Sequence, residues 1–179
     1  QDLFTQYGVA AAYQAIKQSG LASQGEGQNI DPFRLGVYFG SGIGGFATQY
    51  REIAKMIEDP SGQWISPLFI PTMISNIAAG HIAIMHHAEG PCLDIVTACA
   101  TSTNAMGEAF RAIRNGYADA IITGGCENAT IPIGIVGFAN AKALPRTTHP
   151  KHASLPLNAN PAGSVMAPGS APLLLAEEA

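Results

Sequence analysis

Three short runs of nearly continuous apolar residues constrain the fold of this 179-residue chain most strongly. They span residues 35–39, 92–97 and 118–123, and segments with helical patterns lie between them. Strands that are apolar on both faces are typical of parallel sheets, which helices cover on both sides through right-handed crossovers. The sequence therefore predicts an α/β layered domain with a buried, mostly parallel central sheet.

Helices are predicted from apolar periodicity and from the residues that end helices. The predicted helices span residues 3–19, ended by Gly20; 47–58, ended by Pro60; 72–88; 104–115, closed by Gly116; and 134–143. Residues 145–172 are rich in Pro, Asn, His and Ser and are predicted to be loop, followed by a possible edge strand at 173–175.

Composition excludes several classes of protein. The net charge of −4 and the lack of a basic run give no reason to expect binding to nucleic acid or to an anionic membrane. The longest apolar stretch, residues 73–85, is interrupted by polar residues and glycine, so no membrane span or signal peptide is predicted. Only 12% of residues are charged, so we expect apolar faces to meet a partner.

Three cysteines, Cys92, Cys99 and Cys126, are odd in number and lack the paired Cys-x-x-Cys spacing of zinc sites. This pattern indicates unpaired, reduced thiols, and we expect a cytoplasmic protein with no metal site.

Cys99 is the main candidate for a reactive residue, because it lies where an apolar strand meets a helix. Unpaired N–H groups and the helix dipole favour an anion at a helix N-terminus, so a thiolate there can act as a nucleophile without a neighbouring base. The flanking Ala98 and Ala100 leave room for a substrate. The alternative is a buried, inert cysteine, and on these residues alone both interpretations stay open.

The segment 40–45 reads G-x-G-x-x-G and lies after a strand and before a helix, as in dinucleotide-binding proteins. That fingerprint also needs a second strand ending in an acidic residue roughly 20 residues on. Here Asp59 closes a helix instead. We therefore favour a tight glycine turn that packs beside the nucleophile.

No other polar residue is assigned a catalytic role. The five histidines are predicted to be structural or on the surface, and His86 and His87, which are adjacent, would point to different helical faces and make a poor metal pair. Glu127, at a strand end, is expected to be buried and paired.

Residues 90–102, GPCLDIVTACATS, resemble the nucleophile segment of the elongating β-ketoacyl-acyl-carrier-protein synthases. These are condensing enzymes of fatty-acid synthesis with the thiolase fold. Further blocks match in the same order, at residues 2–7, 40–45, 66–71, 75–81 and 124–127. The resemblance covers residues 1–157 and implies a layered, thiolase-like domain.

The resemblance implies a reaction and a set of partners. Cys99 would attack the thioester of an acyl carrier protein and hold the chain, before decarboxylative condensation with malonyl-carrier protein. Ile74 would lie at the end of the acyl pocket, with simple core packing as its alternative, and Phe138 at the pocket wall. No cofactor is implied, although the carrier protein brings a phosphopantetheine arm. A homodimer is expected, with residues 72–88 and 118–123 as candidate contact surfaces.

Parts of the family pattern are missing from this sequence. Family members begin with a further strand and continue with a second half that supplies two catalytic histidines, a lysine and a glycine-rich loop. We therefore expect an N-terminal half, residues 1–157, with the first strand and the second half absent. Residues 158–179 form a divergent tail, where prolines replace charged residues and should weaken or reroute the usual strand.

Other functions are compatible with these residues. A polyketide ketosynthase or a thiolase would share the fold and the cysteine, although residues 66–80 favour the fatty-acid elongation type over thiolase. The alternative of another class is a noncatalytic truncated subunit or scaffold, against which the presence of Cys99 argues.

Overall fold

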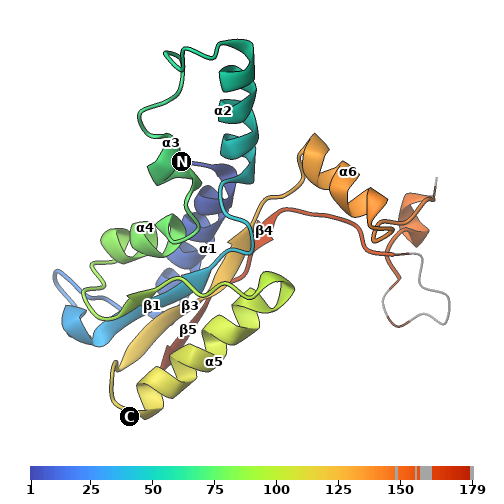
Figure 1. Cartoon of the computed structure of the whole chain (residues 1–179). Helices are drawn as coiled ribbons and strands as arrows, with labels where there is room; N and C mark the ends of the chain where they lie inside the picture. The colour runs from blue at the N-terminus through green and yellow to red at the C-terminus, as the bar shows by residue number, and fades with distance from the viewer. Residues whose placement is uncertain (148, 156, 158–162, 178–179) are drawn as a thin grey trace.

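The computed structural model describes residues 1–147, 149–155, 157 and 163–177. Within them, one five-stranded sheet has the order β2-β1-β3-β4, and β5 also pairs with β3 (Figure 1). The strands are β1 (Leu35–Gly40), β2 (Cys92–Leu93), β3 (Ala120–Glu127), β4 (Gly169–Ser170) and β5 (Leu173–Ala176). β1 is parallel to β2 and β3, whereas β4 and β5 are antiparallel to β3. The predicted α/β class with a mostly parallel sheet is confirmed.

Helices cover both faces of this sheet. α1 (Leu3–Ser19) and α4 (Ile77–Met85) pack on one face, and α5 (Thr101–Arg114) packs on the other. Successive side chains of a strand point to opposite faces. Val37 and Phe39 of β1 therefore belong to the cluster under α1 and α4, whereas Tyr38 packs with α5. Two covered faces explain why the strands read as continuous apolar runs.

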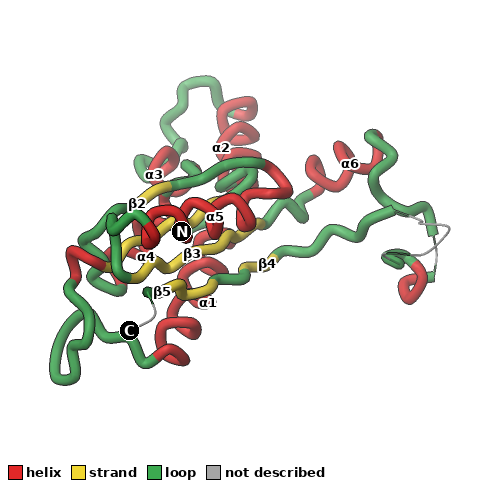
Figure 2. The backbone as a smooth tube through the Cα atoms, turned by 90° about the horizontal axis from the view of Figure 1, so that it is seen from below, coloured by secondary structure: helices red, strands yellow, loops and turns green. Residues whose placement is uncertain are grey.

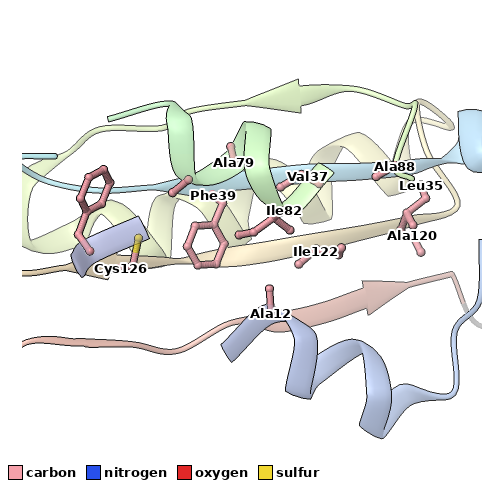
Figure 3. Packing of buried hydrophobic residues seen from close by; sticks show 12 residues of the cluster. Ala12, Leu35, Val37, Phe39, Ala79, Ile82, Ala88, Ala120, Ile122 and Cys126 are labelled. Atoms are coloured by element: carbon pink, nitrogen blue, oxygen red, sulfur yellow. The ribbon is translucent and has the colours of Figure 1, made fainter. Parts of the chain in front are cut away.

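The larger core cluster lies between α1, α4 and the sheet. Figure 3 shows Phe39, Ile82 and Ile122 grouped there, and each of these side chains is fully buried. Burial of one such side chain contributes about 1.5–3 kcal/mol to folding. The alanines of both helices, Ala12 and Ala79 among them, allow the helices to lie close to the sheet.

Most predicted helices are present with small shifts. α1 matches its prediction, beginning after the Asp2 cap and ending at Gly20, which has a left-handed φ of 71°. α2 (Phe46–Glu58) begins one residue early, and α6 (Pro132–Asn140) begins and ends earlier than predicted. α5 begins three residues early.

The prediction of one continuous helix over residues 72–88 is wrong. The chain forms α3 (Phe69–Met73) and α4, with a break at residues 74–76, where Ile74 is extended. The carbonyl oxygen of Met73 accepts the N–H of Gly45 at 2.8 Å, and Ile77 donates to Ile74 instead. The glycine turn therefore takes an acceptor that a continuous helix would have used.

The predicted strand at 92–97 is shorter than expected, because only Cys92–Leu93 pairs with β1. Residues 94–97 leave the ladder and cross over Gly40, where the carbonyl oxygen of Ile95 occupies the space of a missing Cβ. β3, in contrast, extends to Glu127, four residues beyond the predicted end.

The proposed dimer contact through residues 118–123 is also wrong. β3 has β1 on one side and β4 and β5 on the other, and residues 120–126 are all buried. An interior strand has no free edge to offer to another molecule.

In the C-terminal part, the predicted edge strand is confirmed as β5. α6 and residues 141–147, which follow it, extend away from the sheet in both views (Figures 1 and 2). Asn158, Pro161 and Ala162 lie outside the described residues, so the predicted weakening of a strand there stays a prediction. Among the described residues, no helix is long and apolar enough to cross a bilayer.

Candidate active site

Cys99 lies in a short 3-10 turn, Ala98–Ala100, which continues directly into α5. Its position at the N-terminal end of that helix agrees with the prediction. The residue is exposed. Ala98, immediately before it, has a φ of 51°, a left-handed conformation that costs a residue with a Cβ roughly 1–2 kcal/mol. Backbone strain of this kind gathers at functional sites.

Within the described residues, the backbone N–H of Cys99 is free, although the N–H groups of the next two residues are hydrogen-bonded. Ala100 donates to the carbonyl oxygen of Thr97 at 3.1 Å, and Thr101 donates to that of Ala98. No acceptor for the N–H of Cys99 is found in the described part of the chain, and no side chain caps α5. A negative charge at Cys99 would therefore meet the open, positive end of the helix.

Side-chain hydrogen bonds hold the turn in place. The N–H of Thr97 donates to Oγ1 of Thr101 at 3.0 Å, and Nδ2 of Asn104 donates to Oγ1 of Thr97 at 2.7 Å. Both partners come from the first turn of α5, so the helix fixes the segment that leads to Cys99.

Glycines allow the Cys99 turn to lie directly on the sheet. A Cβ on Gly40 would overlap the carbonyl oxygen of Ile95, and a Cβ on Gly125 would overlap Oγ of Ser102. The glycine turn, residues 40–45, thus packs beside the Cys99 turn, as the favoured interpretation of its sequence predicts. Its Ile43 and Gly44 N–H groups already donate to Glu127 and Ser41, so they are not open to a pyrophosphate.

A cavity of about 610 Å³ lies over Cys99. Its walls come from the glycine turn, the end of β3, α6 and residues 165–171. Phe138 of α6 lines this cavity together with Cys99, as expected for a pocket-wall residue. Ile74 lies in the break between α3 and α4 and is not part of the lining, so its assignment to the pocket end stays a prediction. The volume lies in the range of small-molecule pockets.

Glu127 and Ser41 complete one wall of the cavity. The Glu127 carboxylate accepts hydrogen bonds from Oγ of Ser41 at 3.3 Å, from the N–H of Ile43 at 3.0 Å and from the N–H of Asn128 at 3.1 Å. Partial burial raises the pKa of Glu127, and these hydrogen bonds oppose that shift. Glu127 is partly buried and hydrogen-bonded rather than ion-paired within the described residues.

The carboxylate of Asp94 is hydrogen-bonded to the break between α3 and α4. Oγ of Ser75 donates to this carboxylate at 2.5 Å. Its Oδ1 is buried and has no partner within the described ranges. Burial raises the pKa of Asp94.

The other two thiols differ from Cys99. Burial raises the pKa of Cys126 to about 12, and the nearby Glu127 and Asp94 act in the same direction. Partial burial, together with the charge of Asp94, raises the pKa of Cys92. Chemistry at a thiolate is therefore disfavoured at both positions.

None of the described histidines lines the cavity over Cys99. His86 stacks on Tyr13 with ring centroids 6.5 Å apart, and burial lowers its pKa, as expected of a structural residue. The described residues contain no group of three His, Cys, Asp or Glu side chains that could hold a metal ion.

Residues 1–179 match the family model of the β-ketoacyl synthase N-terminal domain. The chain belongs to the β-ketoacyl synthase family. Among curated relatives, it is 41% identical over 177 residues to 3-oxoacyl-[acyl-carrier-protein] synthase 2 of Vibrio cholerae, covering 98% of this chain and 42% of that protein. The Synechocystis protein of the same name is also 41% identical, with 98% of this chain and 41% of that protein covered.

Solved structures of ketosynthases share the fold. A β-ketoacyl synthase from Burkholderia phymatum superimposes with a TM-score of 0.79 at 23% identity, covering 98% of this chain and 42% of that chain. A type II polyketide ketosynthase, solved in complex with its acyl-carrier protein, gives 0.88 at 24% identity and 98% and 44% coverage. The thiolase-like fold class is therefore confirmed for this β-ketoacyl synthase chain, which spans about two-fifths of the length of the relatives.

Cys99 and Phe138, both candidates from the sequence, line the cavity, whereas the hydrogen bonds of Ser41, Asp94 and Glu127 were not predicted. Each had a signal in the sequence of this β-ketoacyl synthase domain. Glu127 follows two glycines at a strand end, Asp94 interrupts an apolar run, and Ser41 is the polar residue of the glycine turn.

Proposed function

We propose that this chain is the nucleophile-bearing part of an elongating β-ketoacyl-acyl-carrier-protein synthase of fatty-acid biosynthesis. The observation that carries the proposal is the position of Cys99, exposed at the uncapped N-terminus of α5 and facing a cavity of about 610 Å³. The 41% identity to 3-oxoacyl-[acyl-carrier-protein] synthase 2 supports the fatty-acid substrate class and the acyl carrier protein as partner.

The first half-reaction is transfer of an acyl group to Cys99. The thiolate attacks the thioester carbonyl, and a bond forms between Sγ and the carbonyl carbon. The oxyanion of the tetrahedral intermediate accepts a hydrogen bond from the free backbone N–H of Cys99. The bond to the carrier-protein sulfur then breaks, and the departing thiolate takes a proton from water. The acyl chain enters the cavity along Phe138, and the family resemblance assigns its far end to Ile74, beyond the cavity lining.

The second half-reaction, decarboxylation of malonyl-carrier protein and C–C bond formation, belongs in this proposal to the complete enzyme. General acid and base groups are needed for it. The part of the chain that the structure describes brings no histidine to the cavity. We expect this chain to become acylated without releasing a ketoacyl product, in a cytoplasmic setting that keeps its thiols reduced.

A polyketide ketosynthase is the second candidate, and the similarity to a polyketide ketosynthase bound to its carrier protein favours it at the level of the fold. The higher sequence identity lies with the fatty-acid enzymes, so we rank elongation first. A thiolase ranks below both. A noncatalytic scaffold would have no use for an exposed cysteine at an uncapped helix end.

The test is acyl transfer followed by intact-mass spectrometry. The chain is incubated with acyl-loaded acyl carrier protein, and the Cys99→Ala and Cys92→Ala variants are treated in parallel. We expect one acyl adduct on the natural chain and on Cys92→Ala, and none on Cys99→Ala. An acyl adduct that still forms on Cys99→Ala contradicts the assignment of Cys99 as the nucleophile. Steady condensation with malonyl-carrier protein by this chain alone contradicts the proposal that the second half-reaction needs the complete enzyme.

A further inference from the structure

The glycine turn, residues 40–45, forms a wall of the cavity, and the side chain of Glu127 from a distant part of the chain holds it in place. We infer that Glu127 is a positioning residue, which fixes this turn against the Cys99 turn and so aligns the acyl thioester with the sulfur. The inference rests on the proposed function of Cys99.

The contacts of Glu127 divide between its two oxygens. Oε1 accepts from Oγ of Ser41 and from the N–H of Asn128, whereas Oε2 accepts from the N–H of Ile43. Ser41 extends this network, because its Oγ accepts the N–H of Gly44 at 2.9 Å. The carboxylate accepts hydrogen bonds from the turn and from Asn128, the residue that follows β3. Glu127 is the residue that joins them.

The network reaches Cys99 through Gly42. A Cβ on Gly42 would lie 3.0 Å from Oε2 of Glu127 and 3.5 Å from the carbonyl oxygen of Ala98. Gly42 therefore packs between the carboxylate and the strained residue that precedes Cys99. If the turn moved, the cavity wall would move and Ala98 would lose a packing neighbour.

The contacts of Glu127 favour positioning over proton transfer. Its carboxylate receives three donors, and none of the ion pairs found in the described ranges includes it. Oxygens that already accept backbone N–H groups are poorly placed to take a proton from a substrate. Charge-assisted hydrogen bonds to backbone N–H groups are, however, strong and geometrically specific.

The experiment compares two reactions at Cys99 in the same protein. One is acylation by a short straight-chain acyl thioester of N-acetylcysteamine, and the other is alkylation by iodoacetamide, each followed by mass spectrometry. Both reactions need the thiolate, so an effect of charge on ionisation cancels in the ratio of their rates. Only acylation needs the carbonyl to be aligned with the sulfur and the backbone donor.

The variants are Glu127→Gln, which keeps the shape but loses the charge, and Ser41→Ala, which removes the link to Gly44. Glu108→Gln is the matched control, because Glu108 lies on α5, pairs with Arg111 and does not line the cavity. A cooperative unfolding transition in urea reports that each variant is folded, because Glu127 itself contributes to the raised pKa of Cys126 and labelling of that thiol would not be a neutral reporter.

We expect the ratio of acylation to alkylation to fall about ten- to a hundredfold in Glu127→Gln, less in Ser41→Ala, and not at all in Glu108→Gln. An unchanged ratio of acylation to alkylation in folded Glu127→Gln overturns the inference about Glu127 but leaves the proposed function of Cys99 intact. If Glu127→Gln does not fold, an unchanged ratio in folded Ser41→Ala overturns the inference instead. A natural chain that is alkylated at Cys99 but never acylated overturns the proposed function, and the inference with it.

Discussion

The three cysteines should differ sharply in their reaction with iodoacetamide, although they lie within 35 positions of the same chain. Burial raises the pKa of Cys126 from its ordinary 9.0 to about 12. A rise of this size lowers the thiolate fraction at pH 8 by about a thousandfold, and only the thiolate reacts. Because just 4% of Cys126 is exposed, access of the reagent is restricted as well.

Cys92 and Cys99 are both exposed, so access does not separate them. The pKa of Cys92 is raised by partial burial and by the charge of Asp94. Cys99 instead lies at the open N-terminus of α5. We therefore expect the order of labelling to be Cys99, then Cys92, and Cys126 last, at a rate at least a thousandfold below that of a free thiol.

The assay is a limiting dose of iodoacetamide at pH 8, followed by digestion and mass spectrometry of the three cysteine peptides. The same labelling in denaturant is the control, and there the three rates should become similar. Equal labelling of all three thiols under native conditions would refute the reasoning, because it would mean that neither burial nor the helix end controls reactivity.

Three further predictions follow from the packing. Gly40→Ala should lower the free energy of unfolding, measured by urea titration, by about 1–3 kcal/mol, since its Cβ would overlap the carbonyl oxygen of Ile95. Gly80→Ala is the control, because Gly80 lies on α4 with open space around it, and this variant should raise the free energy of unfolding by about 0.5–1 kcal/mol. As pH rises from 9 toward 12, the free energy of unfolding should fall, because the folded chain retains the proton of Cys126 that the unfolded chain has lost; a flat profile in denaturant titrations would contradict this. If the chain is a homodimer through α4, Ile84→Asp on its exposed face should shift light scattering toward the monomer, and a natural chain that is monomeric at micromolar concentration excludes the dimer.

Local signals predicted most of the secondary structure. α1 follows from its apolar periodicity and from caps at both ends, and Asp2 and Gly20 are adjacent to the helix in sequence. β1 and β3 follow from apolar runs that a sheet covered on both faces requires. These elements are recognisable because the interactions that define their type lie within a few residues.

The wrong predictions involve residues whose partners are distant in the sequence. The helix over 72–88 breaks because Gly45 donates to Met73, and the strand over 92–97 ends early because the chain crosses Gly40. Neither contact leaves a mark in the periodicity of the segment that it alters. Tertiary hydrogen bonds and close packing outweigh the local preference there.

The sequence by itself determined that Cys99 stands at the junction of a strand and a helix, since apolar pattern and helix start are both local. Only the tertiary structure decided what surrounds it. Ser41 and Glu127 are 86 positions apart, yet their hydrogen bond closes the wall beside Cys99. The cavity likewise joins β1, β3, α6 and the C-terminal segment. Such a site depends on how parallel strands bring their ends to one edge of the sheet, and that arrangement is set by the packing of the whole domain.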